Sequence, residues 1–252
     1  MTARPPDGAP LGVIAAMPEE LAAVVGAMEV HEVVTIGGRD FHRGRYAGAP
    51  AVCVVSRIGK VAAAATTAIL IERFAPRAVV MTGLAGGVDP RLAIGDIVIA
   101  DRLVQHDLDA RPLFPRHEIP LLGVSEIAAD RALSDQLAAA ADAFVPPPEV
   151  VALGVAPAIR VWRGLVASGD QFFAHPEAVA ALRELLPETL AVEMEGAAIA
   201  QICHEHGVPF AVARVISDPA DHTAAVDFAR FLSVACGPYA LALTRATGTR
   251  LP

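Results

Sequence analysis

The sequence lacks several features that would assign it to whole classes of protein. Only three of its 252 residues are cysteine, and they lie far apart, at Cys53, Cys203 and Cys236. Such a spacing predicts no disulfide framework and agrees with a reducing compartment. Lys and Arg together number 20 against 28 Asp and Glu, which gives a net charge of −8. With no cluster of basic residues to offset this charge, a nucleic-acid-binding surface is not expected.

Long apolar runs are also missing. The chain is 54% hydrophobic, but a charge, Gly or Pro interrupts each apolar run before it reaches the roughly 18 residues that would suggest a membrane span. The polar, proline-rich start MTARPPDGAP contains no apolar core of a signal peptide, so residues 1–10 are interpreted as a flexible tail. We therefore expect a cytoplasmic protein without membrane contact, whose partner is a small molecule.

What the sequence does contain is an alternation of short Val/Ile runs with longer Ala/Leu runs, which is typical of an α/β domain with a mostly parallel sheet. The expected strands are Leu11–Ala16, Ala51–Ser56, Arg77–Thr82, Asp96–Ala100, Arg163–Ala167, Leu190–Met194 and Pro209–Ser217. The expected helices are Pro18–Met28, Lys60–Phe74, Ala128–Ala143, Pro176–Leu185, Gly196–His206 and Ala225–Thr247. A hairpin over Val30–Tyr46, turning at Gly37 and Gly38, adds antiparallel strands, so the sheet is predicted to be mixed. Because the alternation resumes after the proline-rich segment 144–159, residues 11–248 are predicted to form one domain.

Acidic residues follow three of the expected strands. Glu19 and Glu20 come after the first strand, Glu195 after the sixth and Asp218 after the seventh. In open parallel α/β sheets, ligands bind beyond the carboxyl ends of the strands, so these carboxylates are expected to share one crevice. A fourth strand leads into GLAGG, which is interpreted as a turn. It matches neither a P-loop nor a dinucleotide fingerprint, so phosphate binding is not inferred from it.

Each acid also has a purely structural explanation. Carboxylates in the first turn of a helix are favoured by its dipole, and Asp218, which precedes a proline, could simply begin a loop. The run AVEMEGAAIA, residues 191–200, is harder to explain because Glu193 and Glu195 lie in an apolar segment and need hydrogen-bond donors. A hydroxyl-rich ligand such as a sugar and internal ion pairs with Arg214 or Arg163 explain them equally well.

The grouping of Cys203, His204 and His206 raises the question of a metal site. On a helix, only Cys203 and His206 are spaced so that both could bind the same metal ion. His106, Asp107 and Asp109 are more simply explained as polar loop residues, so no metal is predicted.

A series of segments in this order resembles the 5'-methylthioadenosine/S-adenosylhomocysteine nucleosidases of the purine nucleoside phosphorylase superfamily. The segments are AAMPEEL, SRIGKVAAA, TGLAGG, GDIV, SGDQFF, AVEMEGAAIA, VPFAVARVISDPAD and DFARFL, and the match as a whole extends from about Leu11 to Leu232. The resemblance implies a three-layer α/β/α sandwich around a mixed, partly barrelled sheet. It also implies hydrolysis of the N-glycosidic bond of adenine thionucleosides without metal or organic cofactor, by a homodimer.

The same resemblance implies roles for individual residues. Asp218 would protonate adenine N7, Glu20 would activate the attacking water, and Glu195 would bind the ribose hydroxyls. The remaining implied substrate-binding residues are Met194 and Glu193 beside the ribose, Phe172 and Phe173 at the adenine, Arg214 near the water, Met17, Ile58 and Phe228 around the 5' substituent, and Leu84 and Ser217. Leu113, in the loop of residues 105–120, would reach the site of the neighbouring subunit.

One position departs from the family pattern. Leu84 occupies the third position of TGxAGG, where the family usually has a small polar residue whose hydroxyl helps to hold the water and its carboxylate. The loop that shapes the 5' pocket differs too, so the preferred 5' substituent stays open. Two other functions remain alternatives: a phosphorylase that uses phosphate, with Arg57 as its one nearby anion ligand, and a non-catalytic nucleoside-binding protein.

Overall fold

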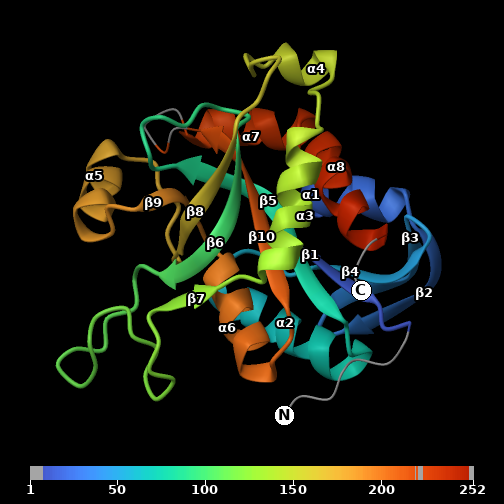
Figure 1. Ribbon diagram of the computed structural model, residues 1–252, viewed down its shortest axis with the longest axis horizontal. Helices are drawn as coiled ribbons and strands as arrows, with labels where there is room; N and C mark the ends of the chain where they lie inside the picture. Colours follow the sequence, from blue (N-terminus) through green and yellow to red (C-terminus); the bar gives the residue numbers. More distant parts are fainter. Residues whose placement is uncertain (1–7, 219, 221–223, 250–252) are drawn as a thin grey trace.

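The computed structural model describes residues 8–218, 220 and 224–249, and in it a mixed sheet lies between two groups of helices (Figure 1). The strands are β1 Leu11–Ala15, β2 Glu29–Ile36, β3 Arg39–Tyr46, β4 Ala49–Val55, β5 Ala78–Gly87, β6 Ile97–Gln105, β7 Glu126–Ala128, β8 Val161–Ser168, β9 Thr189–Glu193 and β10 Phe210–Asp218. The helices are α1 Pro18–Gly26, α2 Lys60–Phe74, α3 Arg131–Asp142, α4 Pro148–Val151, α5 Pro176–Leu185, α6 Gly196–His206, α7 Ala224–Val234 and α8 Cys236–Thr249. The expected α/β/α architecture is confirmed.

The sheet is partly closed into a barrel. Its strand order is β10-β6-β8-β9-β5-β1-β4-β3-β2, with β7 beside β6, and β10 pairs in addition with β5. The strands β5, β10, β6, β8 and β9 therefore form a ring, from which β1, β4, β3 and β2 continue as an open sheet. β1 is parallel to both of its neighbours, whereas β10 and β6 are antiparallel, so the predicted mixed sheet is confirmed.

Helices cover both faces of the central strands, which explains why those strands are apolar along their whole length. Side chains alternate between the faces, so Val13 of β1 belongs to a core cluster with α1, α3, α7 and α8. Its neighbour Ile14 belongs to the opposite cluster, with α2 and α6. Both side chains are completely buried.

The ends of several elements differ from the prediction. The helix expected from Ala128 begins at Arg131, because residues 126–128 pair with β6 as β7 and Asp130 caps the helix by accepting the Leu133 N–H at 2.9 Å. The single helix expected over 225–247 is two helices, α7 and α8, which meet at Ala235. The short helix α4, within the proline-rich connection, was not predicted.

The prediction for the hairpin is confirmed, whereas the prediction for the Gly-rich segment is wrong. β2 and β3 form the predicted hairpin, and Gly37 and Gly38 at its turn have φ values of 59° and 69°, which favour glycine. The segment GLAGG, expected to be a turn, instead completes β5, where Gly86 pairs with Val192 of β9. Most of the predicted tail, residues 1–7, lies outside the described residues. None of the described helices is long and apolar enough to cross a membrane.

Candidate active site

A pocket opens where β1, β5, β9 and β10 end. Its empty space, open mouth included, is about 650 Å³. The predicted residues that line it are Met17, Glu20, Ile58, Leu84, Phe172, Phe173, Glu193, Met194, Glu195, Arg214, Asp218 and Phe228. Sequence reasoning missed Ala16, Ala85, Gly86, Gln171 and Val192. Most of these flank predicted residues within the same motifs.

Glu20 reaches the pocket from the first turn of α1. Its side chain is only 3% exposed, unlike that of its neighbour Glu19, which faces solvent. One carboxylate oxygen accepts the N–H groups of Ala16 and Met17, both at 2.9 Å, and the other accepts the Leu84 N–H at 3.0 Å. Burial raises the pKa of Glu20, and the charge of Arg214 and these N–H groups oppose the rise. A buried carboxylate with a raised pKa is suited to accept a proton from water near neutral pH.

Leu84 supplies Glu20 with a donor despite having no hydroxyl. The donor is the backbone N–H of Leu84, while the side chain is 5% exposed and belongs to the core cluster on the α1 face. A backbone N–H at residue 84 therefore holds Glu20 in place although the side chain has no hydroxyl.

Arg214 and Glu193 form an ion pair in the wall of the pocket, and both are almost completely buried. Glu193 also accepts the hydroxyl of Ser168 and the backbone N–H groups of Glu195 and Gly196. These donors occupy both of its carboxylate oxygens. Of the two explanations left open by the sequence, Glu193 fits the internal one: it holds Arg214 and the start of α6.

Glu195 lies beside this ion pair and also lines the pocket. One oxygen accepts the Gly59 N–H at 2.9 Å, at the start of α2, and the other lies 3.1 Å from Arg214 Nη2. Burial, together with the charge of Glu193, raises the pKa of Glu195 to about 7, against the lowering effect of Arg214. Burial alone would lower the pKa of Arg214, but Glu193, Glu195 and Glu20 together raise it. One buried guanidinium therefore neutralises part of a three-carboxylate cluster.

Asp218 is the last residue of β10 and is 2% exposed. The Ser217 hydroxyl donates to one carboxylate oxygen at 2.7 Å, and the Ala220 N–H donates to the other at 2.9 Å. Ser217, predicted to contact substrate, does not line the pocket and instead holds Asp218 in place.

Two glycines of β5 let the acids approach the strand closely. A Cβ added to Gly83 would lie 2.7 Å from Glu20 Oε1, and one added to Gly86 would lie 3.3 Å from Asp218 Oδ1. Because a strand rises about 3.3 Å per residue, these two positions are about 10 Å apart along β5. Glu20 and Asp218 thus lie beside different parts of β5, and both line the pocket.

Gly83→Ala is expected to lower kcat/KM at least about tenfold, because the new methyl group would collide with Glu20 and Arg214. Steady-state kinetics on an adenine nucleoside, the substrate class that the sequence resemblance implies, would measure the effect. Gly26→Ala is the matched control, since a Cβ there meets nothing within 4 Å. Equal activity of Gly83→Ala and wild type would contradict the geometry.

Aromatic and aliphatic side chains form the outer part of the pocket. The Phe172 ring is 49% exposed and packs edge-on against Phe228, with 5.8 Å between centroids. Phe173 is buried and packs edge-on against His106 at 5.4 Å. Phe172 is therefore free to stack on a flat ligand, as an adenine site requires.

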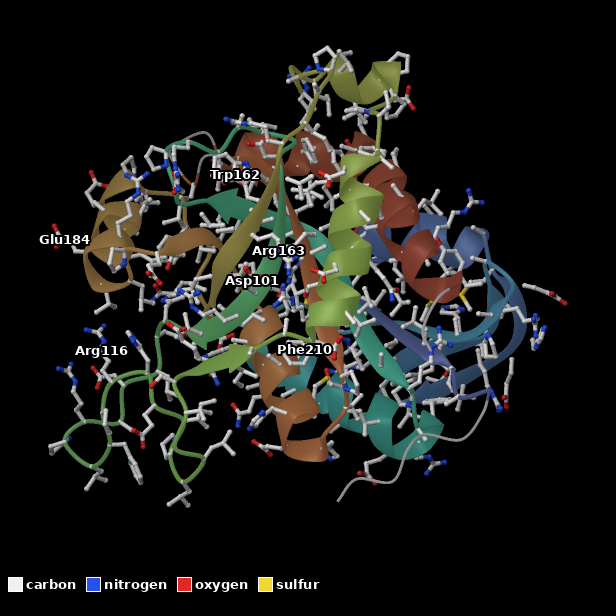
Figure 2. The ribbon with its side chains drawn as sticks, in the orientation of Figure 1. Asp101, Arg116, Trp162, Arg163, Glu184 and Phe210 are labelled. Carbon is white, nitrogen blue, oxygen red and sulfur yellow. The ribbon has the colours of Figure 1, made fainter. Side chains whose placement is uncertain are left out.

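Leu113 does not line this pocket. Its side chain is 84% exposed, in the loop between β6 and β7 that extends away from the rest of the fold (Figure 1). Arg116, labelled in Figure 2, marks the same loop. The expectation that this loop completes the site of a second subunit stays a prediction.

Two other arginines considered from the sequence are not part of the site. Arg163 pairs with Asp101 at 2.9 Å and with Asp135, on the face covered by α3 (Figure 2). Arg57 is exposed and donates to the Gly38 carbonyl at 2.7 Å. Within the described part of the chain, no group of three His, Cys, Asp or Glu residues is arranged to hold a metal.

Comparisons with known proteins agree with this geometry. A family model described as the phosphorylase superfamily matches residues 10–244. The chain is 39% identical over 226 residues to the 5'-methylthioadenosine/S-adenosylhomocysteine nucleosidase of Marinomonas sp. (strain MWYL1), which covers 89% of this chain and 92% of that protein. The structure of this chain is similar to that of the Neisseria meningitidis 5'-methylthioadenosine/S-adenosylhomocysteine nucleosidase in complex with methylthio-immucillin-A. The TM-score is 0.85 and the identity 34%, and the match covers 96% of this chain and 100% of that one. The futalosine hydrolase of Helicobacter pylori strain 26695 is also similar, with TM-score 0.82, 31% identity and coverage of 96% and 98%.

Proposed function

This chain belongs to the 5'-methylthioadenosine/S-adenosylhomocysteine nucleosidases of the phosphorylase superfamily, and from that premise we propose which bond it cleaves and how. The reaction is hydrolysis of the N-glycosidic bond of 5'-methylthioadenosine, S-adenosylhomocysteine or a related 5'-deoxyadenosine. The products are adenine and the 5-substituted ribose. One observation carries the proposal: Glu20, Glu195 and Asp218 are all buried around a single pocket with an aromatic mouth.

The proposed mechanism places the two catalytic acids on opposite sides of the sugar. Asp218 gives a proton to adenine N7 as the bond from C1' to the base breaks, and the base leaves neutral. Glu20 takes a proton from the water whose oxygen bonds to C1'. Cleavage makes the sugar resemble an oxocarbenium ion, so an acid at the base and a carboxylate at the water are both needed, as in inverting glycosidases.

The other lining residues bind and orient the substrate in this proposal. Glu195 accepts hydrogen bonds from the ribose hydroxyls, with the Met194 backbone beside it. Phe172 stacks on the adenine, and Met17 and Ile58 contact the 5' substituent. The active form is proposed to be a homodimer in which the loop of residues 105–120 closes the neighbouring pocket.

A phosphate-dependent reaction fits this pocket less well. Phosphate would face the buried carboxylate of Glu20, which repels anions, and Arg57 does not line the pocket. Water carries no charge and needs a base to activate it, which Glu20 provides. The pocket therefore suits water better than phosphate as the nucleophile.

We expect the purified protein to release adenine from 5'-methylthioadenosine and S-adenosylhomocysteine without added phosphate. Adenine can be followed by liquid chromatography over a panel of 5'-substituted adenosines, with inosine as the control for base recognition. A strict phosphate requirement would favour a phosphorylase. Tight binding of these nucleosides without any turnover would favour a binding protein.

A further inference from the structure

A second hollow adjoins the active-site pocket at the end proposed for the 5' substituent. Ala16, Met17 and Ile58 line both spaces, so the two hollows are neighbours that share one wall. From there the hollow runs toward the turn between β2 and β3, and we call it the hairpin groove. Its polar lining residues are Arg39, Asp40, His42 and Arg57.

The two arginines of the hairpin groove are fixed by backbone carbonyls rather than by acids. Arg39 donates to the carbonyls of Gly37 at 3.0 Å and Ser56 at 3.3 Å, and Arg57 donates to that of Gly38 at 2.7 Å. In the part of the chain that the structure describes, neither forms an ion pair. Arg43 lies on β3, as Arg39 does, but outside the groove, and it forms an ion pair with Glu32 at 3.6 Å. The groove therefore presents two cations without a counterion from these residues.

These cations are close enough to affect each other. Burial lowers the pKa of Arg39, and the positive charge of Arg57 lowers it further. Arg57 moreover has a φ of 73°, a backbone conformation that favours glycine over a side chain. Residues in such conformations tend to occur at functional sites. An anion between the two guanidinium groups would relieve their repulsion and explain the position of Arg57.

The charges and the apolar rim together match one kind of 5' substituent. Asp40 adds a single carboxylate to the groove, and its Oδ1 accepts the Thr35 hydroxyl at 2.6 Å. Two cations and one anion are complementary to an α-amino acid, which carries a carboxylate and an ammonium group. Met17 and Ile58, between the groove and the pocket, offer an apolar passage for a thioether chain.

We propose that the hairpin groove binds the amino-acid end of a 5'-thioether substituent, and that Arg39 and Arg57 thereby favour S-adenosylhomocysteine over 5'-methylthioadenosine. This inference rests on the proposed function, because it assigns the groove to the same substrate. The carboxylate lies against Arg39 and Arg57, and the ammonium group lies toward Asp40.

The test compares kcat/KM for S-adenosylhomocysteine, 5'-methylthioadenosine and 5'-butylthioadenosine, which has a long 5' chain without charge. Arg39→Gln and Arg57→Gly are each expected to lower the ratio of S-adenosylhomocysteine to 5'-methylthioadenosine about tenfold, the loss of a charge-assisted contact. Glycine suits the backbone at residue 57, so the second variant is expected to fold. Arg43→Gln is the matched control and should leave the ratio unchanged.

Two results would overturn the inference. One is an unchanged ratio of S-adenosylhomocysteine to 5'-methylthioadenosine in both variants. The other is an equal fall in kcat/KM for 5'-butylthioadenosine and for S-adenosylhomocysteine, which would assign the effect to chain length and not to charge. If the wild type released no adenine at all, the proposed function would fail instead. Calorimetry would then give the dissociation constants of S-adenosylhomocysteine and 5'-methylthioadenosine. Their ratio in the wild type and the variants would still decide whether the groove binds the amino acid.

Discussion

Glu20→Gln is expected to lower kcat by about 10²- to 10⁴-fold, the contribution typical of a general base. The amide keeps the volume of the carboxylate but cannot take a proton from water. Its NH₂ group would also face one of the three backbone N–H groups that the carboxylate accepts, from Ala16, Met17 and Leu84. Steady-state kinetics of adenine release would measure kcat and KM separately, and the change should lie mainly in kcat.

Glu19→Gln is the matched control for this variant. Glu19 is the preceding residue of the same helix and is exposed, so its change should leave kcat within about twofold of wild type. In the wild type, activity should fall as the pH drops through the raised pKa values of Glu20 and of Glu195, the latter about 7. A Glu20→Gln enzyme that retained more than a tenth of wild-type kcat would remove Glu20 from the mechanism.

Much of the fold was predictable because buried strands have a strong signature. Runs of Val and Ile marked the core of each central strand, but they did not mark its end, because pairing with a neighbour can extend a strand through weakly apolar residues. β5 continues through Gly86 because that residue pairs with Val192 of β9, a contact far away in sequence. The start of α8 does have a signal in the sequence, because Pro238 lies in its first turn, where proline is favoured.

The acids of the candidate site were predictable from their places at strand ends, whereas their hydrogen-bond donors were not. Glu20 and Glu195 are held by the N–H groups of Leu84 and Gly59. A backbone donor exists at almost every residue, so residue type gives no sign of it. For the same reason, the leucine at position 84 suggested that Glu20 lacks a donor there, whereas the backbone N–H of Leu84 supplies one.

Arg214→Met is expected to destabilise the protein by about 3–5 kcal/mol at about pH 8, the range observed when one partner of a buried ion pair is removed. Arg214 is 1% exposed and lies among Glu193, Glu195 and Glu20, so its loss leaves three buried carboxylates without a cation. Urea unfolding followed by circular dichroism would give the difference in the free energy of unfolding. Arg163→Met is the control: it also removes an arginine that pairs with two acids, but its side chain is 35% exposed, and a loss of about 0–1 kcal/mol is expected.

The loss in Arg214→Met should depend on pH in a definite direction. A carboxyl group with a raised pKa binds its proton more tightly in the folded state, so its ionisation costs stability as the pH rises from the unfolded value toward the folded one. In the wild type this window runs for Glu195 from the ordinary 4.5 to about 7. Arg214 lowers the pKa of both Glu195 and Glu20, so removing it widens the window for each. The variant should therefore lose less stability relative to the wild type at about pH 5, where Glu195 is protonated, than at about pH 8. An equal loss at about pH 5 and about pH 8 would show that Arg214 stabilises the fold by packing and not by its charge.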